Sequence, residues 1–105
     1  MKPLIVYITA ADREEADAIC ERLVDERLAA CATIVDDVTS VYRWKGSVER
    51  STEVLMMVKT MSSRYRRLES RVQELHSYEN PEIIAVELYA GSRDYLIWLQ
   101  EETSE

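Results

Sequence analysis

The sequence predicts a mixed α+β fold with the element order βαββαβ, a long β-hairpin and one extra C-terminal helix. Three observations support this prediction. Two short runs are apolar and β-branched, two runs carry apolar residues at helical spacing, and two long runs rich in Val and Thr flank a Lys-Gly pair. The chain has 105 residues, which is the length of one domain, so we expect residues 1–105 to form a single unit.

The first expected strand is Leu4–Ile8, a continuous apolar run typical of a strand buried on both faces. A helix should follow. Asp12 is a suitable N-cap, and Glu15 stands three residues after it, as in a capping box. The apolar stripe of this helix contains Ala16, Ile19, Cys20, Leu23 and Val24. Cys20 is therefore expected in the core.

The hairpin is expected over residues 31–44 and 47–60, with Lys45-Gly46 as its two-residue turn. Each arm has about 14 residues, roughly 46 Å when extended at ~3.3 Å per residue. A compact chain of this length has a radius of gyration of only ~13 Å. The arms must therefore bend or project. Asp36 and Asp37 are poor strand formers, so we expect a bend or bulge there.

The second half of the chain completes the pattern. Ser62 or Ser63 can cap a second helix, and residues 82–88 are expected to form the fourth strand. Ser92 can cap the terminal helix. The apolar residues of the second helix are Tyr65, Leu68, Val72 and Leu75. Those of the terminal helix are Tyr95, Trp98 and Leu99. This order is that of a ferredoxin-like sandwich.

Alternation along the second hairpin arm predicts which face meets the helices. That face contains Val48, Val54, Met56 and Val58, and the opposite face contains Glu49, Glu53, Leu55, Met57 and Lys59. Leu55 and Met57 are apolar on a face that the two main helices cannot cover, so another subunit or the terminal helix must bury them. Together with the projecting hairpin, this predicts a homo-oligomer formed by pairing of strand edges.

Composition narrows the class of function. A net charge of −7 argues against nucleic-acid binding. No membrane-spanning run or secretory signal is recognisable, and two cysteines without C-x-x-C spacing favour a reducing compartment, so we expect a cytoplasmic protein. With only two glycines, the chain lacks a phosphate-binding loop, and no catalytic motif is present. His76, the single histidine, is expected on the surface near a helix end. The sequence thus favours a protein that is not an enzyme.

Five segments in order carry a resemblance to a known family. They are ERLAACATI, TSVYRWKG, VLMMVKT, YENPEIIAVEL and GSRDYLIWL. Together they cover essentially the whole chain, and they resemble the CutA family of divalent-cation tolerance proteins. The resemblance implies a homotrimer in which hairpin strands pair across subunits, with a shape similar to PII signalling proteins. It also implies a role in tolerance to copper and other divalent metals, with metal binding in some members.

The resemblance singles out two candidate metal ligands, Cys31 and His76. Cu(I) prefers sulfur and imidazole donors. Cys31 opens a strand directly after a helix, where a thiol can approach a subunit junction, whereas a free cysteine is also a common core residue. Packing is the alternative for both residues. Some members carry a second cysteine where this chain has Ile8, so a two-thiolate site within one subunit is not expected.

The resemblance also points to a cleft between subunits. The candidate residues are Tyr42, Trp44, Glu53, Lys59, Tyr78 and Glu82. Glu53 and Lys59 are roughly 20 Å apart along one strand, so they serve one site only if different subunits contribute them. Such a cleft suits a small anionic effector, which makes a PII-like signalling protein the alternative function. A further alternative is a non-catalytic trimeric scaffold for a protein partner.

Overall fold

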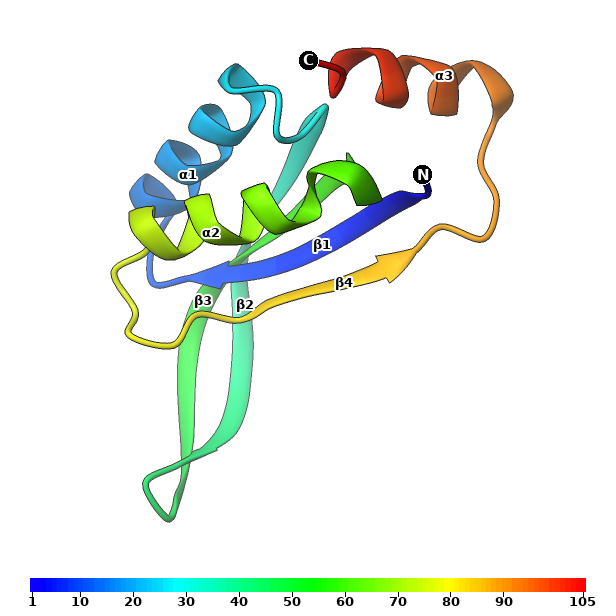
Figure 1. Ribbon diagram of the computed structural model, residues 1–105. Coiled ribbons are helices and arrows are strands. Elements are labelled where there is room, and N and C mark those ends of the chain that lie inside the picture. Colours follow the sequence, from blue (N-terminus) through cyan, green and yellow to red (C-terminus); the bar gives the residue numbers. More distant parts are fainter.

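The computed structural model describes all 105 residues and has the predicted element order (Figure 1). The elements are β1 (Pro3–Ala10), α1 (Arg13–Asp25), β2 (Cys31–Trp44), β3 (Ser47–Met61), a short 3-10 helix (Ser62–Arg64), α2 (Tyr65–Leu75), β4 (Ile83–Glu87) and α3 (Arg93–Glu102). The four strands form one antiparallel sheet in the order β2-β3-β1-β4. The predicted α+β fold is therefore confirmed, including the extra helix.

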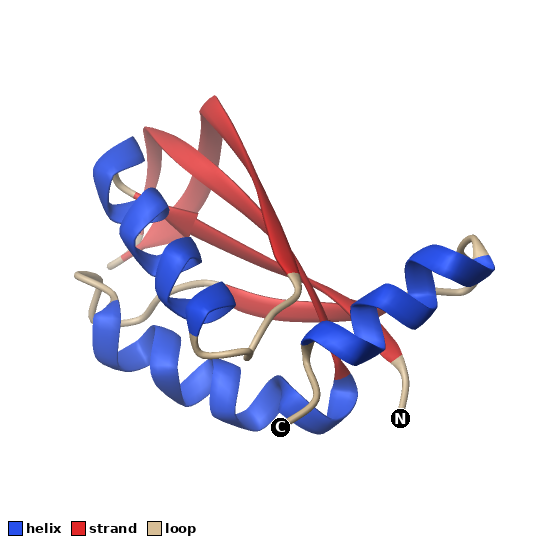
Figure 2. Ribbon diagram, turned by 90° about the horizontal axis from the view of Figure 1, so that it is seen from above, coloured by secondary structure: helices blue, strands red, loops and turns tan.

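Two layers make up the body of the molecule. Helices α1 and α2 lie side by side on one face of the sheet, and α3 lies beyond them, near the start of β1 (Figures 1 and 2). The far half of the β2–β3 hairpin projects from this body, which is why the molecule measures 44 × 26 × 22 Å. No helix combines the length and the apolar composition needed to cross a bilayer.

The main core lies between the sheet and the two helices. Fourteen buried residues form it, among them Val6, Ile8, Val54, Met56 and Val58 from the sheet. The predicted strand faces are thus confirmed near the helices, and Cys20 is buried as expected. The prediction for Val48 was wrong because this residue is 66% exposed. Its position on the projecting part of β3 takes it beyond the reach of the helices.

The hairpin has both the predicted two-residue turn and the predicted bulge. Lys45 and Gly46 have φ angles of 49° and 83°, the pair of positive values that a type I′ turn requires. Along the arms, Val35 pairs with Leu55 but Val38 pairs with Glu53, so Asp36 and Asp37 face a single residue of β3. This is a β-bulge, and Asp37 adopts a positive φ of 56° within it.

Helix capping was predicted correctly at α1 and incorrectly at α2. The Asp12 side chain accepts a 2.9 Å hydrogen bond from the Glu15 N–H. Ser62 instead belongs to the 3-10 helix, and its Oγ accepts the Lys2 N–H, so α2 begins without a side-chain cap. Glu15 completes no capping box either, because its carboxylate accepts hydrogen bonds from the N–H and hydroxyl of Ser77. These tertiary contacts were not visible in the local pattern.

Candidate functional site

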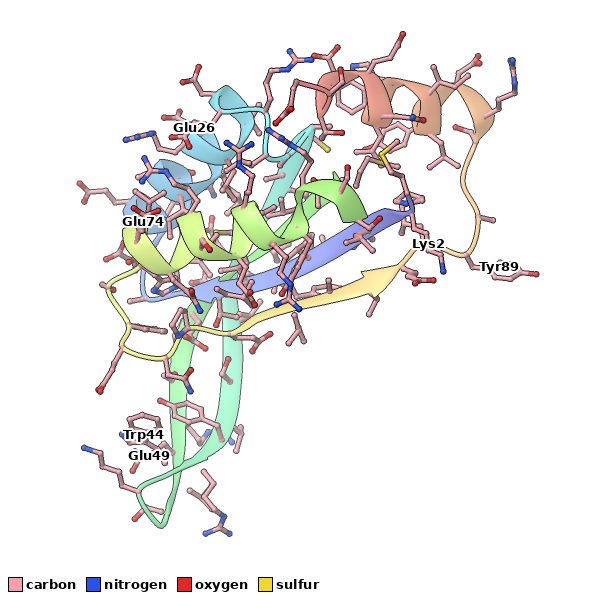
Figure 3. The ribbon with its side chains drawn as sticks, viewed as in Figure 1. Lys2, Glu26, Trp44, Glu49, Glu74 and Tyr89 are labelled. Carbon is pink, nitrogen blue, oxygen red and sulfur yellow. The ribbon has the colours of Figure 1, made fainter.

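A cleft of about 630 Å³ lies between the hairpin and the segment that connects α2 to β4. Figure 3 shows one of its residues, Trp44, on the projecting part of the hairpin. The lining consists of Thr9, Ser40, Val41, Tyr42, Trp44, Glu53, Tyr78, Glu79, Asn80, Pro81 and Glu82. The volume is within the range of small-molecule sites in proteins.

Glu53, one of the lining residues, stands directly beside the β-bulge. Glu53 is the first residue of β3 to pair after the bulge, opposite Val38. Bulges change the direction of neighbouring side chains. Both Glu53 and the adjacent Val54 are buried, although consecutive strand residues normally point to opposite faces. A carboxylate is held at the base of the hairpin with only 7% of the residue exposed.

Tyr78 is the principal partner of Glu53 within the chain. Its hydroxyl donates a 2.7 Å hydrogen bond to Glu53 Oε2. Burial, followed by this hydrogen bond and the Glu53 charge, raises the pKa of Tyr78 well above its usual value. Tyr78 is therefore a neutral donor at physiological pH. Oε1 of Glu53 makes no hydrogen bond. Every fully buried side-chain oxygen of the structure has a hydrogen-bond partner, so Oε1 is not fully buried and is open to the cleft.

His76 fixes the segment that carries Tyr78. Its Nε2 lies 2.7 Å from the Thr9 carbonyl oxygen and donates a hydrogen bond to it, while Nδ1 accepts the N–H of Tyr78 at 3.0 Å. The centres of the His76 and Tyr78 rings lie 4.7 Å apart. His76 is 8% exposed, so the predicted surface position was wrong. It is buried because it joins the end of β1 to the connection before β4.

Five of the six cleft residues singled out by sequence line this one cleft, namely Tyr42, Trp44, Glu53, Tyr78 and Glu82. Lys59 does not line it. Its Nζ donates a 2.7 Å hydrogen bond to Thr33, further along the sheet. The sequence prediction missed Glu79, Asn80 and Pro81, although all three stand between two selected positions, Tyr78 and Glu82. The cleft contains three carboxylates and no Lys, Arg or His.

The two cysteines have different environments. Cys20 is buried, and burial raises the pKa of its thiol to about 11. Cys31 is half-buried at the start of β2, with Sγ 3.3 Å from the Tyr95 hydroxyl oxygen. Hydrogen bonding to Cys31 and then burial raise the pKa of Tyr95 to about 12. Cys31 is therefore the more accessible thiol.

The structure does not bring the two predicted metal ligands together. Cys31 pairs with Lys59 of β3, and Lys59 in turn pairs with Ile5 near the start of β1. His76 instead contacts Thr9 near the end of β1. The two predicted ligands therefore lie toward opposite ends of this strand. No group of three or more His, Cys, Asp or Glu side chains is arranged to hold a metal ion. A metal site in which Cys31 is one of three or more such ligands therefore requires donors from outside a single chain.

Comparisons with known proteins agree over nearly the whole chain. The family described as "CutA1 divalent ion tolerance protein" matches residues 4–102. The divalent-cation tolerance protein CutA of Thermus thermophilus is 46% identical over 99 residues, covering 94% of this chain and 96% of the relative. Protein CutA of Homo sapiens is 39% identical over 97 residues, 92% of this chain, but this match spans only 54% of the human protein.

Solved structures give the same result. The structure of the divalent cation tolerance protein Cut A1 from Thermus thermophilus superposes with a TM-score of 0.95 at 45% sequence identity. The superposition covers 97% of this chain and 99% of that one. The fold, including the hairpin and the terminal helix, is thus similar in both proteins.

Proposed function

Because this chain belongs to the CutA1 divalent ion tolerance family, we propose that it is a non-enzymatic homotrimer that serves divalent-cation tolerance by binding copper through Cys31. The observation that carries this proposal is the position of the Cys31 thiol. It is half-buried on β2, an edge strand of the sheet, where a neighbouring copy can approach it. The free thiols support a reducing, cytoplasmic location.

The proposed trimer is supported by the open edges of the sheet. Both β2 and β4 are edge strands, and exposed edges pair readily with other strands. Ile84 and Val86 on β4 are exposed apolar residues, as are Val41 and Val48 on the hairpin. Light scattering at micromolar concentration should give three times the chain mass of 12.2 kDa. A single-chain mass would contradict the trimer.

Copper binding would combine Cys31 thiols from different chains, because one chain supplies a single accessible thiol. Cu(I) accepts two or three soft ligands, and the thiolate is the binding form. Both His76 ring nitrogens are already hydrogen-bonded, so His76 joins the site only if one of these bonds is exchanged for the metal.

An anaerobic Cu(I) competition titration tests this proposal on the reduced protein. Cys31→Ser should lose copper binding while it keeps the mass of the assembly. Cys20→Ala is the matched control, because it removes a buried thiol and should retain copper. Equal titration of the native protein and Cys31→Ser would show that Cys31 has only a packing role.

A second candidate function is binding of a small-molecule effector, and the specific observation in its favour is the cleft. Its volume of about 630 Å³ and its lining of aromatic and carboxylate side chains suit a metabolite. A thermal-shift screen of metabolites and metal ions separates the two functions. Stabilisation by a metabolite in the presence of a chelator supports the effector, and stabilisation by copper alone supports the metal.

A further inference from the structure

We propose that Arg64 and Arg67 form a binding site for a phosphate group, and that the Glu105 carboxylate occupies this site when no ligand is bound. The ligand is inorganic phosphate or a small phosphate monoester. The site shares no residue with the cleft or with Cys31, so it is independent of both proposed functions. Arg64 ends the 3-10 helix and Arg67 lies in the first turn of α2, a spacing that places both side chains on one side of the helix.

Arg64 is a nearly buried cation that the backbone holds in position. Only 7% of the residue is exposed, and its Nε donates a 3.2 Å hydrogen bond to the carbonyl oxygen of Arg27. Nη1 donates to Glu105, and Nη2 makes no hydrogen bond. Since every fully buried side-chain nitrogen has a partner, Nη2 reaches the surface. Arg64 therefore presents a fixed positive charge at a point that an anion can reach.

The Glu105 carboxylate shows how this site holds an anion. Its Oε1 accepts a 2.9 Å hydrogen bond from Nη1 of Arg64 and a second one, also of 2.9 Å, from Nη1 of Arg67. Guanidinium groups bind phosphate oxygens by the same charge-assisted hydrogen bonds, often two at a time. A phosphate oxygen can take the place of Oε1, and the other phosphate oxygens can accept from the nitrogens that Glu105 leaves unused.

Glu105 is weakly held, so an external anion can replace it. The Glu105 side chain is 75% exposed and that of Arg67 is 66% exposed. Ion pairs as exposed as this contribute little free energy in water. Arg64 keeps its hydrogen bond to the Arg27 carbonyl when Glu105 leaves, because that bond does not involve Glu105. The site is thus already formed before a ligand arrives.

The charge around the site favours phosphate over a second carboxylate. Arg27 joins the same region, but its guanidinium donates to the carbonyl oxygens of Glu101 and Ser104 and makes no ion pair. Arg27, Arg64 and Arg67 therefore share one bound carboxylate within the chain. A phosphate monoester has a charge of about −1.5 to −2 near pH 7, so it compensates more of this positive charge than a carboxylate does.

The site lies on a part of the molecule that pairing of strands between copies does not use. Arg64 and Arg67 belong to the helix layer on one face of the sheet (Figure 2). The proposed trimer instead uses the edge strands β2 and β4 and the exposed apolar residues on them. Phosphate binding can therefore be measured on the intact assembly.

An NMR titration of the reduced protein with inorganic phosphate, at constant ionic strength, tests the inference. The side-chain Nε–H signals of the arginines report binding, and we expect saturable shifts for Arg64 and Arg67. Glu105→Gln should reach saturation at a several-fold lower phosphate concentration, because it removes the internal competitor. Glu102→Gln is the matched control. It removes the same charge from an exposed residue of α3 and should behave like the native protein.

A second pair of variants tests the arginines themselves. Arg67→Gln should abolish the saturable shift of the Arg64 signal. Arg66→Gln removes the same charge at the next position, where the side chain is 90% exposed and pairs with Glu69, and it should retain binding. A parallel titration with glycerol 3-phosphate identifies the source of the phosphate group. Tighter binding of this monoester indicates a phosphorylated small molecule, and tighter binding of inorganic phosphate indicates the free ion.

Three outcomes would overturn the inference. If the native protein and Glu105→Gln saturate at the same phosphate concentration, Glu105 does not occupy the site. If Arg66→Gln and Arg67→Gln weaken binding equally, phosphate is an adventitious ion only, attracted by the general positive charge of α2. If Arg67→Gln lowers the mass of the assembly, the two arginines hold neighbouring copies together.

Discussion

The hydroxyl of Tyr78 donates a 2.7 Å hydrogen bond to the carboxylate of Glu53, and this contact joins the α2–β4 connection to the base of the projecting hairpin. The two residues are 25 positions apart in the sequence. Both residues line the cleft. The same bond makes Tyr78 the only hydrogen-bond partner of a buried carboxylate, so changes at Tyr78 should affect stability as well as ligand binding.

Tyr78→Phe should lower the free energy of unfolding by about 1 to 3 kcal/mol, because Glu53 Oε2 would remain buried without a donor. Urea unfolding at fixed protein concentration measures this change. Tyr89→Phe is the control, since Tyr89 is fully exposed (Figure 3) and should leave stability unchanged. If Tyr78→Phe unfolds at the same urea concentration as the native protein, the hydrogen bond contributes nothing to stability.

His76→Gln should loosen the segment from residue 76 to residue 82. Glutamine can replace at most one of the two ring-nitrogen hydrogen bonds, to the Thr9 carbonyl and the Tyr78 N–H. Hydrogen exchange should therefore become faster at Tyr78 while exchange in β1 stays slow. Unchanged protection of the Tyr78 amide would contradict the positioning role. The Cu(I) titration of the same variant tests separately whether His76 is a metal ligand.

Two substitutions at the hairpin turn should have opposite effects. Gly46 has a φ of +83° and open space around it, so Gly46→Ala should destabilise through the backbone alone, by about 1 kcal/mol. Lys45→Asn should stabilise by a few tenths of a kcal/mol, because asparagine tolerates the positive φ of 49° better than lysine. Thermal unfolding measures both variants. Shifts of the same sign would contradict the type I′ turn.

Cys31 should react with a thiol reagent before Cys20 does. Burial raises the pKa of Cys20 to about 11, so at about pH 8 only about one thiol in a thousand at this position is the reactive thiolate. Native protein should release about one equivalent of the reagent chromophore per chain, and unfolded protein two. The native signal should vanish in Cys31→Ser. Modification of Cys20 first would contradict the burial of that residue.

The sequence was sufficient for the features that depend on local pattern. Alternation in β3 correctly placed Val54, Met56 and Val58 in the core, and Asp12 correctly began α1. The bulge followed from Asp36 and Asp37, two poor strand formers in one arm, and the turn followed from Lys45-Gly46. In each case the determinants lie within a few residues of the feature.

Features that depend on distant contacts could not be predicted in this way. His76 is buried through Thr9, which is 67 positions away, and Ser62 accepts a hydrogen bond from Lys2, 60 positions away. The resemblance grouped Tyr42, Trp44, Glu53, Tyr78 and Glu82, and one chain brings these five residues to one cleft. Lys59 of the same chain lies outside that cleft, where its ammonium donates a hydrogen bond to Thr33.

Native mass spectrometry of the reduced protein decides whether a trimer forms and binds copper through Cys31, because it reports assembly and bound copper in one spectrum. We predict a main species of three 12.2 kDa chains that gains Cu(I) and that stays trimeric but copper-free in Cys31→Ser. A single-chain species, or a trimer whose copper content is the same with and without Cys31, would contradict it.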